Sequence, residues 1–263
     1  MQYQKLAEIY EKLESTTKRL EKTEIISELL QKTSSKDLET VMMLLQGRIF
    51  PPWNDKKIGV ASKLVLKAIN IATGKDLKRI EESWKNTGDL GLTAESLTKT
   101  KQQHTLFSHD LTIEKVFKNI KNLAEAEGQG AVDKKVKLIA ELLTSAKPLE
   151  SRYIVRTILE DLRVGVGEGS IRDAIIWANF GKELNIKYNK NKNDIELSAE
   201  ERAKYNEYTK IIQKASDLTN DFAEVAIIAK EKGIEGLKNV KLEPGKPIKV
   251  MLGPKEKDAK AAL

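Results

Sequence analysis

The chain has 263 residues, no cysteine and only two histidines, His104 and His109, which excludes disulfides, thiolate catalysis and cysteine-based zinc sites. Its 46 Lys and Arg residues exceed its 39 Asp and Glu residues, and the net charge of +7 suits a phosphate-backbone partner without requiring one. Aromatic residues make up only 5% of the chain, which disfavours a stacking platform for single-stranded nucleic acid.

Apolar residues recur at helical spacing along almost the whole chain, beginning with a stripe from Leu6 to Leu20. Shorter stripes follow at residues 25–30 and 38–45. Further helices are predicted at 60–73, 75–86, 111–126, 132–144, 149–162, 169–179, 199–215 and 220–231. Asn and Lys crowd residues 185–194, which indicates an exposed loop, and the one clear strand signal is residues 247–252.

The sequence therefore predicts an all-α fold of about a dozen helices with a short extended C-terminal tail. The longest apolar runs are too short to span a membrane, and the N-terminus has the pattern of an amphipathic helix rather than a signal peptide. We therefore expect an intracellular, cytoplasmic protein with no membrane partner, acting as a monomer.

An internal repeat divides this helical chain. Ile26-Ser-Glu-Leu-Leu30 recurs as Ile139-Ala-Glu-Leu-Leu143. Downstream, Gly59-Val-Ala-Ser-Lys-Leu-Val-Leu-Lys-Ala-Ile69 is matched by Gly165-Val-Gly-Glu-Gly-Ser-Ile-Arg-Asp-Ala-Ile175. Two copies are too few for a solenoid, so we expect a pseudo-two-fold pair of helical halves, at about residues 22–86 and 131–180, each presenting one turn.

The second of these turns is lined by glycines and flanked by arginines. It resembles a dinucleotide fingerprint only superficially, because the residues before it have helical spacing and no strand follows. A purely structural turn between helices is one interpretation. The other uses the turn's backbone N–H groups and the N-terminus of the next helix to bind phosphate, in a turn small enough for a minor groove.

No catalytic set of residues emerges from the sequence, and its three tryptophans, Trp53, Trp84 and Trp177, are expected to be core or half-buried anchors. One polar stretch between helices stands apart, because Gln103 precedes two adjacent apolar residues, Leu106 and Phe107. These side chains could insert into a pocket on a partner protein, or they could fold back onto the core of the chain itself.

Taken together, the chain resembles the N-terminal DNA-binding domain of ATP-dependent DNA ligases, particularly archaeal ones. The resemblance rests on the repeat turns and on four further segments: Gly47-Arg-Ile-Phe-Pro-Pro-Trp53, Gly88-Asp-Leu-Gly-Leu-Thr-Ala-Glu95, Arg152-Tyr-Ile-Val-Arg-Thr157 and Pro244-Gly-Lys-Pro-Ile-Lys-Val-Met-Leu252. It implies an all-helical domain over residues 1–242, whose paired turns grip the minor groove on both sides of a nick in double-stranded DNA. Residues 243–263 would be an extended linker toward the ligase's own adenylation domain.

Carried over residue by residue, the implied DNA-binding positions are Gly59, Ser62, Lys63, Arg152, Arg156, Arg163, Gly165, Gly167, Gly169, Ser170 and Arg172. The resemblance also implies that Gln103, Leu106 and Phe107 bind a PCNA-like sliding clamp, and a clamp-docking adaptor is the alternative function. The family's Lys-x-Asp-Gly nucleophile motif occurs nowhere in this sequence. We therefore expect a DNA-binding, nucleoid-associated fragment that itself holds no metal or cofactor. The parent ligase would use ATP and Mg²⁺. A stand-alone enzyme is a third interpretation, and it would require that the chain adenylate itself.

Overall fold

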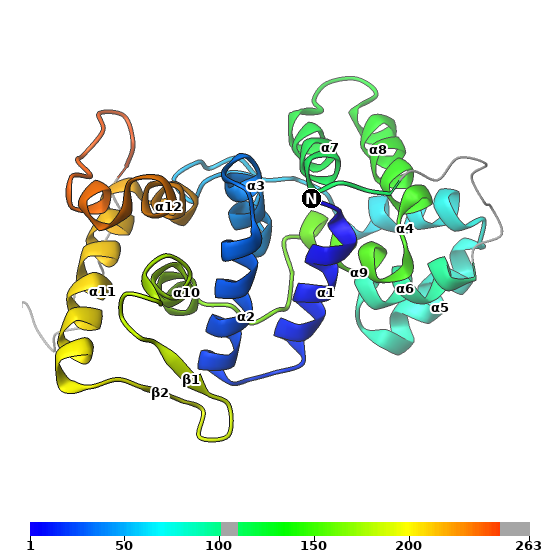
Figure 1. Ribbon diagram of the computed structural model, residues 1–263. Helices are drawn as coiled ribbons and strands as arrows, with labels where there is room; N and C mark the ends of the chain where they lie inside the picture. Colours follow the sequence, from blue (N-terminus) through cyan, green and yellow to red (C-terminus); the bar gives the residue numbers. More distant parts are fainter. Residues whose placement is uncertain (101–109, 248–263) are drawn as a thin grey trace, which may run out of the picture.

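The computed structural model describes residues 1–100 and 110–247, which form twelve α-helices and one small β-hairpin (Figure 1). The elements are α1 (Tyr3–Glu14), α2 (Arg19–Lys32), α3 (Ser35–Leu45), α4 (Ser62–Thr73), α5 (Leu77–Thr87), α6 (Leu90–Lys99), α7 (Ile113–Glu125), α8 (Ala131–Ser145), α9 (Pro148–Ile158), α10 (Glu168–Phe180), β1 (Lys187–Asn189), β2 (Asp194–Glu196), α11 (Ala199–Thr219) and α12 (Phe222–Lys238). The predicted all-α fold is confirmed.

Local sequence signals account for many of the helix ends. Ser198 and Glu201 form a reciprocal capping box at the start of α11, so two backbone N–H groups that the helix leaves unpaired are satisfied. Helices α4 and α5 each end at a glycine with positive φ, Gly74 and Gly88 respectively. This left-handed conformation often terminates a helix, and glycine adopts it at little cost because it has no Cβ.

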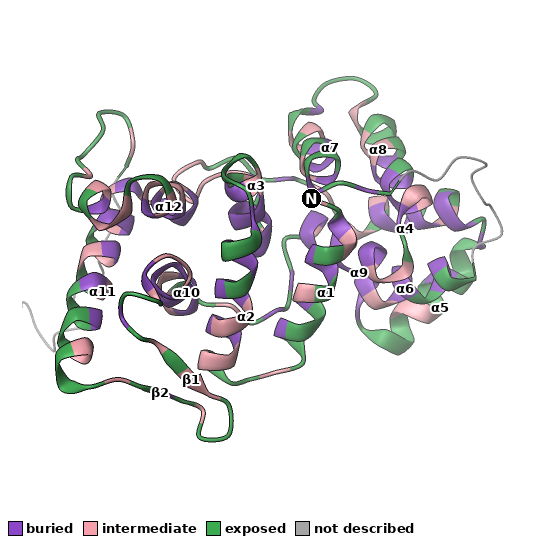
Figure 2. Cartoon of the chain, in the orientation of Figure 1, coloured by how far each residue is buried: buried purple, intermediate pink, exposed green. Residues whose placement is uncertain are grey.

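The helices pack into two adjoining lobes. The first lobe contains α2, α3, α10, α11 and α12, and the second contains α4 to α9. Helix α1 lies between them in Figure 1 and packs against α2, α7 and α9. Each helix turns a buried face toward its neighbours and an exposed face outward (Figure 2), and one connected hydrophobic core runs through both lobes.

The sequence repeat does not coincide with these lobes. Helix α2 carries the first copy of the repeated pentapeptide but packs against α10, which follows the second turn. Helix α8 carries the second copy but packs against α4, which follows the first turn. The repeats therefore exchange helices, and each turn rests on a helix from the other copy.

Three local expectations need correction. Residues 185–194, read as an exposed loop, contain β1 and the start of β2, which pair as an antiparallel hairpin. The helix expected over 149–162 ends earlier, at Ile158, so the last residues of that range belong to the loop before α10. The apolar stripe from Leu6 to Leu20 is divided between α1 and α2.

The strand expected at 247–252 falls almost entirely outside the described residues. No helix in the described ranges has the length and apolar character that crossing a membrane requires.

Candidate nucleic-acid interface

The first turn joins the loop after α3 to helix α4. Its preceding residue, Ile58, is buried in the core, whereas Gly59 is exposed with φ +64°. Two residues later, Ala61 is extended, with ψ 155°, and serves as the N-cap of α4. A buried anchor, a left-handed glycine and an extended cap thus turn the chain sharply into the helix.

The second turn repeats this geometry between α9 and α10. Val164 is buried, Gly165 is exposed with φ +59°, and Gly167 is the extended N-cap of α10, with ψ 166°. The matched positions of the two sequence copies therefore have matched backbone conformations. The repeat predicted from sequence is a structural repeat at its turns.

Both turns present backbone donors at a helix N-terminus. In the part of the chain that the structure describes, the N–H groups of Gly59 and Val60 donate to no protein acceptor, and neither do those of Gly165, Val166 and Gly167. Donors of this kind, together with the positive end of the helix dipole, favour an anion such as a phosphate.

The first turn and the segment that leads into the second turn line a single hollow of about 440 Å³. Val60, Ala61 and Ser62 of the first turn contribute to it, as do Asp161 and Arg163 before the second turn. The buried pair Asp89 and Arg156 also reaches this hollow. The first turn and the residues just before the second turn thus border the same surface.

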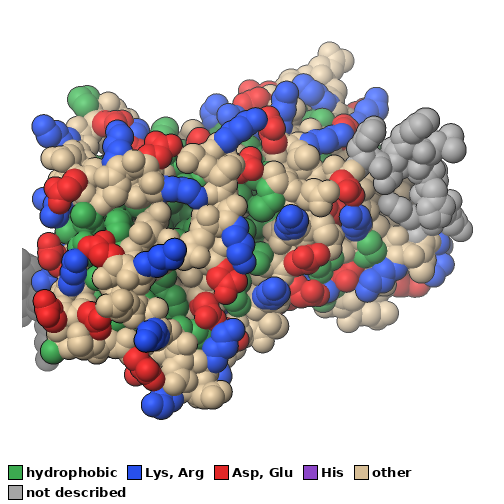
Figure 3. Space-filling model, viewed as in Figure 1, with side chains coloured by type: hydrophobic (Ala, Val, Ile, Leu, Met, Phe, Trp, Pro, Cys, Tyr) green, Lys and Arg blue, Asp and Glu red, His purple; other side chains and the backbone are tan. Residues whose placement is uncertain are grey.

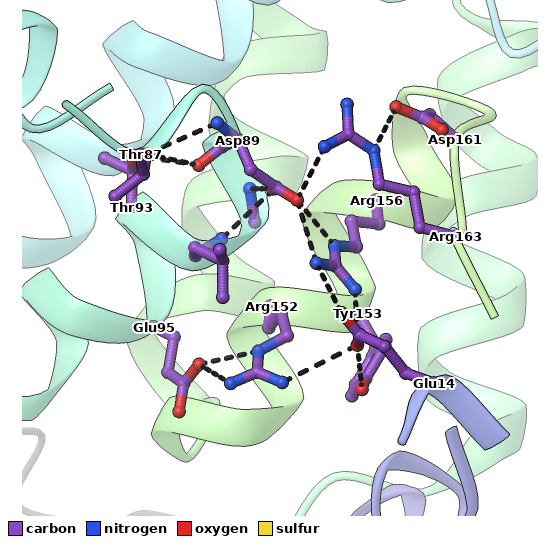
Figure 4. A network of polar contacts seen from close by, with 12 residues as sticks. Glu14, Thr87, Asp89, Thr93, Glu95, Arg152, Tyr153, Arg156, Asp161 and Arg163 are labelled. Carbon is purple, nitrogen blue, oxygen red and sulfur yellow. Dashed lines mark hydrogen bonds and ion pairs between the residues drawn. The ribbon is translucent and has the colours of Figure 1, made fainter. Parts of the chain in front are cut away.

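A network of ion pairs underlies this surface (Figure 4). Oδ2 of Asp89, the N-cap of α6, accepts hydrogen bonds from Nε and Nη2 of Arg156 at 3.1 and 2.8 Å, and from Nη1 of Arg163 at 3.0 Å. The other side of the Arg156 guanidinium donates to both carboxylate oxygens of Glu14, at 2.8 and 3.1 Å. The network therefore joins helices α1, α6 and α9 and reaches, through Arg163, the segment before the second turn.

The network changes the acidity of its carboxyl groups. Burial alone would raise the pKa of Asp89, but hydrogen bonds from Arg156 and its positive charge outweigh burial and lower this pKa. The same opposition, with further help from Tyr153, lowers the pKa of Glu14. Both groups are carboxylates at neutral pH, and Arg156 is fully paired with them.

The predicted DNA-binding residues differ in how far their side chains are exposed. Gly59, Lys63, Arg163, Gly165 and Gly167 are exposed, and the side chain of Arg163 retains 46% of its accessible surface. Partly buried are Ser62, Gly169, Arg152, which pairs with Glu95, and Arg172, which pairs with Asp173. Ser170 is buried.

Arg156 does not fit the prediction of direct phosphate contact. Its side chain is only 4% exposed, and its donors are already used by Asp89 and Glu14. The physical reason is that its face of α9 meets α1 and α6, which spacing along the sequence does not reveal. Arg156 instead supports the candidate interface indirectly, by holding Asp89 and Glu14 in place.

Three basic residues at the turns were not singled out from the sequence. Arg19, at the start of α2, pairs with the buried Asp173 and reaches the carbonyl oxygen of Gly169 at 3.5 Å. Lys22 of α2 and Lys135 of α8 each bond to carbonyl oxygens of one turn. A signal existed: each lysine stands four residues before the first isoleucine of the repeated pentapeptide.

Basic side chains do not gather into one patch on the face shown in Figure 3, where Lys and Arg alternate with Asp and Glu. Within residues 1–100 and 110–247, no group of three or more His, Cys, Asp or Glu side chains could hold a metal ion.

The tryptophans behave as anchors, with Trp177 buried and both Trp53 and Trp84 partly buried. Gln103, Leu106 and Phe107 lie outside the described residues, so the clamp-docking interpretation stays a prediction.

Comparison with known proteins adds a family relationship. A family model described as DNA ligase N terminus matches residues 2–176. The chain is 44% identical over 250 residues to a DNA ligase of Methanothermobacter thermautotrophicus, covering 95% of the chain and 40% of that relative. It is 38% identical over its whole length to a DNA ligase of Thermococcus onnurineus, 42% of which is covered. The chain thus spans about two fifths of the length of these curated relatives.

Proposed function

Because the chain belongs to the family of DNA ligase N-terminal segments, we propose that it is the domain with which a longer ATP-dependent DNA ligase holds double-stranded DNA. The proposed partner is the phosphate backbone and minor groove of a duplex on both sides of a nick. Binding is independent of base sequence, since backbone N–H groups and a few basic side chains read phosphates and groove shape.

The observation that carries this proposal is the equivalence of the two turns. Each supplies unbonded N–H groups before the first turn of a helix, and the first turn shares a hollow with Arg163, which precedes the second turn. Two similar grips suit a ligand that offers the same chemistry twice, as the two phosphate strands of a duplex do. Exposed Lys63 at the start of α4 and Arg163 before the second turn add one basic side chain to each grip.

The proposal assigns binding to this chain and no chemical step. ATP, Mg²⁺ and nick sealing belong to the proposed longer enzyme, and no step in the present proposal passes through them. Attachment to chromosomal DNA would place the protein with the nucleoid.

The test is fluorescence anisotropy with labelled nicked and intact duplexes of several sequences, over a series of salt concentrations. We expect similar affinities for different sequences and a log–log salt slope of about −0.9 for each phosphate neutralised. Lys63→Met should weaken binding, whereas Lys118→Met removes the same charge from an exposed site on α7 and should change little. Absent binding, or binding unaffected by salt, would contradict the proposal.

A further inference from the structure

The two turns share one contact that the proposed function does not explain. Nζ of Lys22 donates to the carbonyl oxygens of Val164 and Gly165 at 2.7 and 2.9 Å. Nζ of Lys135 donates to the carbonyl oxygen of Gly59 at 3.1 Å. Gly59 and Gly165 are the matched left-handed glycines of the repeat, so each turn has a lysine at the same point.

The two lysines are themselves matched positions. Each precedes the repeated Ile-x-Glu-Leu-Leu segment by the same interval, Lys22 before Ile26 and Lys135 before Ile139. Since the repeats exchange helices, the lysine of the first copy holds the second turn and the lysine of the second copy holds the first turn. One interaction thus occurs twice across the pseudo-two-fold relation.

These contacts decide which way the turn amides point. In a trans peptide, the C=O and N–H groups project to opposite sides, and no peptide bond in the described residues is cis. The carbonyl of Gly165 faces α2, so the N–H of Val166 faces away from α2. By the same reasoning, the N–H of Val60 faces away from Lys135. Both amides are among the unbonded donors of the candidate interface.

The ammonium groups also keep their charge uncompensated. In the described part of the chain, neither Lys22 nor Lys135 forms an ion pair with a carboxylate, and both bond only to carbonyl oxygens. Lys22 is 7% exposed, and burial lowers its pKa. A buried cation without an anionic partner is costly. The positive charge of Lys22 would therefore stabilise an anion that binds on the side of the turn facing away from α2.

We propose that Lys22 and Lys135 are positioning residues, which hold the two turns so that their N–H groups face the DNA phosphates. This inference rests on the proposed DNA binding and adds the groups that orient its backbone donors. It assigns neither lysine a direct phosphate contact.

The experiment compares Lys22→Met and Lys135→Met with the control Lys118→Met, which removes the same charge. Methionine keeps an unbranched apolar stem and loses the donor. The side chain of Lys118 makes no hydrogen bond or ion pair within the described ranges. Nicked-duplex affinity is measured over a salt series, and amide spectra are recorded with ¹⁵N-labelled protein.

We expect each turn variant to lose about tenfold in affinity, the usual scale for one hydrogen bond from a charged donor, while the control stays within about twofold. The salt slope should change by less than about half a unit, because no direct phosphate contact is lost. In the free protein, Lys22→Met should shift the amides of Gly165 and Val166, and Lys135→Met those of Val60 and Ala61.

The outcomes separate this inference from the function on which it rests. If the unaltered chain fails to bind DNA, the proposed function falls and this inference with it. If the unaltered chain binds and the variants bind equally well, only the inference falls. A slope smaller by about 0.9 with unchanged amide spectra would mean direct phosphate contact and would overturn the positioning role. Since the Lys135 contact is exposed, that variant is informative even if Lys22→Met unfolds.

Discussion

Arg156 and Asp89 form a buried ion pair whose two hydrogen bonds, of 3.1 and 2.8 Å, join the last turn of α9 to the residue just before α6. Oδ1 of the same aspartate caps α6 by accepting from the N–H groups of Gly91 and Leu92. One carboxylate therefore links a helix N-terminus, a buried arginine and the exposed Arg163. The stability of the fold and the shape of the candidate interface depend on the same group.

Replacing Arg156 with alanine should destabilise the protein strongly. The substitution leaves the carboxylates of Asp89 and Glu14 without their buried cation, and breaking a buried pair in this way costs about 3–5 kcal/mol. The free energy of unfolding from urea denaturation measures it. A loss below about 1 kcal/mol, the range of exposed pairs, would mean that the network contributes little.

Replacing Arg163 with alanine should weaken DNA binding and leave the stability of the fold nearly unchanged. Its half-exposed pairs with Asp89 and Asp161 contribute little to stability, within about 1 kcal/mol. Duplex affinity should fall and the salt slope should shrink by about 0.9, because one phosphate contact disappears. Unfolding and anisotropy titrations on the same preparation give both quantities. An unchanged slope would remove Arg163 from the DNA contacts.

Two glycines of the second turn should respond differently to alanine. At Gly165, φ is +59°, and a side chain in this left-handed conformation costs about 1–2 kcal/mol. An added Cβ would also lie 2.7 Å from Nζ of Lys22. Gly167 has φ −94° with open space around it, and its replacement should change the free energy of unfolding by no more than about 0.5 kcal/mol. Equal losses at both positions would contradict the described turn.

The lowered pKa of Asp89 predicts a specific acid sensitivity. A carboxyl group whose pKa is lower in the folded than in the unfolded chain stabilises the fold above its unfolded pKa, and this stability is lost as the pH falls. The stability difference between the parent chain and Asp89→Asn should therefore be largest near neutral pH and shrink below about pH 4.

A comparison of two proteins is needed because other carboxyl groups oppose this trend. Burial raises the pKa of both Glu150 and Asp221, so these groups favour the folded chain as the pH falls. Urea denaturation of both proteins between acid and neutral pH supplies the difference. A difference that stays constant over that range would mean that Asp89 has an ordinary pKa.

Much of the candidate site could be predicted from the residues alone because its signals are local. The all-α fold follows from apolar spacing. The two turns follow from two matched segments of eleven residues, each of which begins with Gly-Val and ends with Ala-Ile. Glycines 59 and 165 occupy the left-handed conformation that their residue type permits at least cost. The β-hairpin at Lys187–Asn189 and Asp194–Glu196 was missed because its strands are three residues each, too short for a period.

The sequence by itself thus determined the helices, the repeat and the two turns, since each depends on neighbours within a few residues along the chain. Only the tertiary structure decided that Arg156 faces inward, that α2 packs on α10 and α8 on α4, and that Lys22 and Lys135 hold the turns. Apolar spacing shows which face of a helix is buried, but it does not show which other helix covers that face. Two arginines seven residues apart therefore differ in their surroundings. Arg156 is buried between carboxylates from distant segments, whereas Arg163 keeps 46% of its side-chain surface exposed beside its two carboxylate partners.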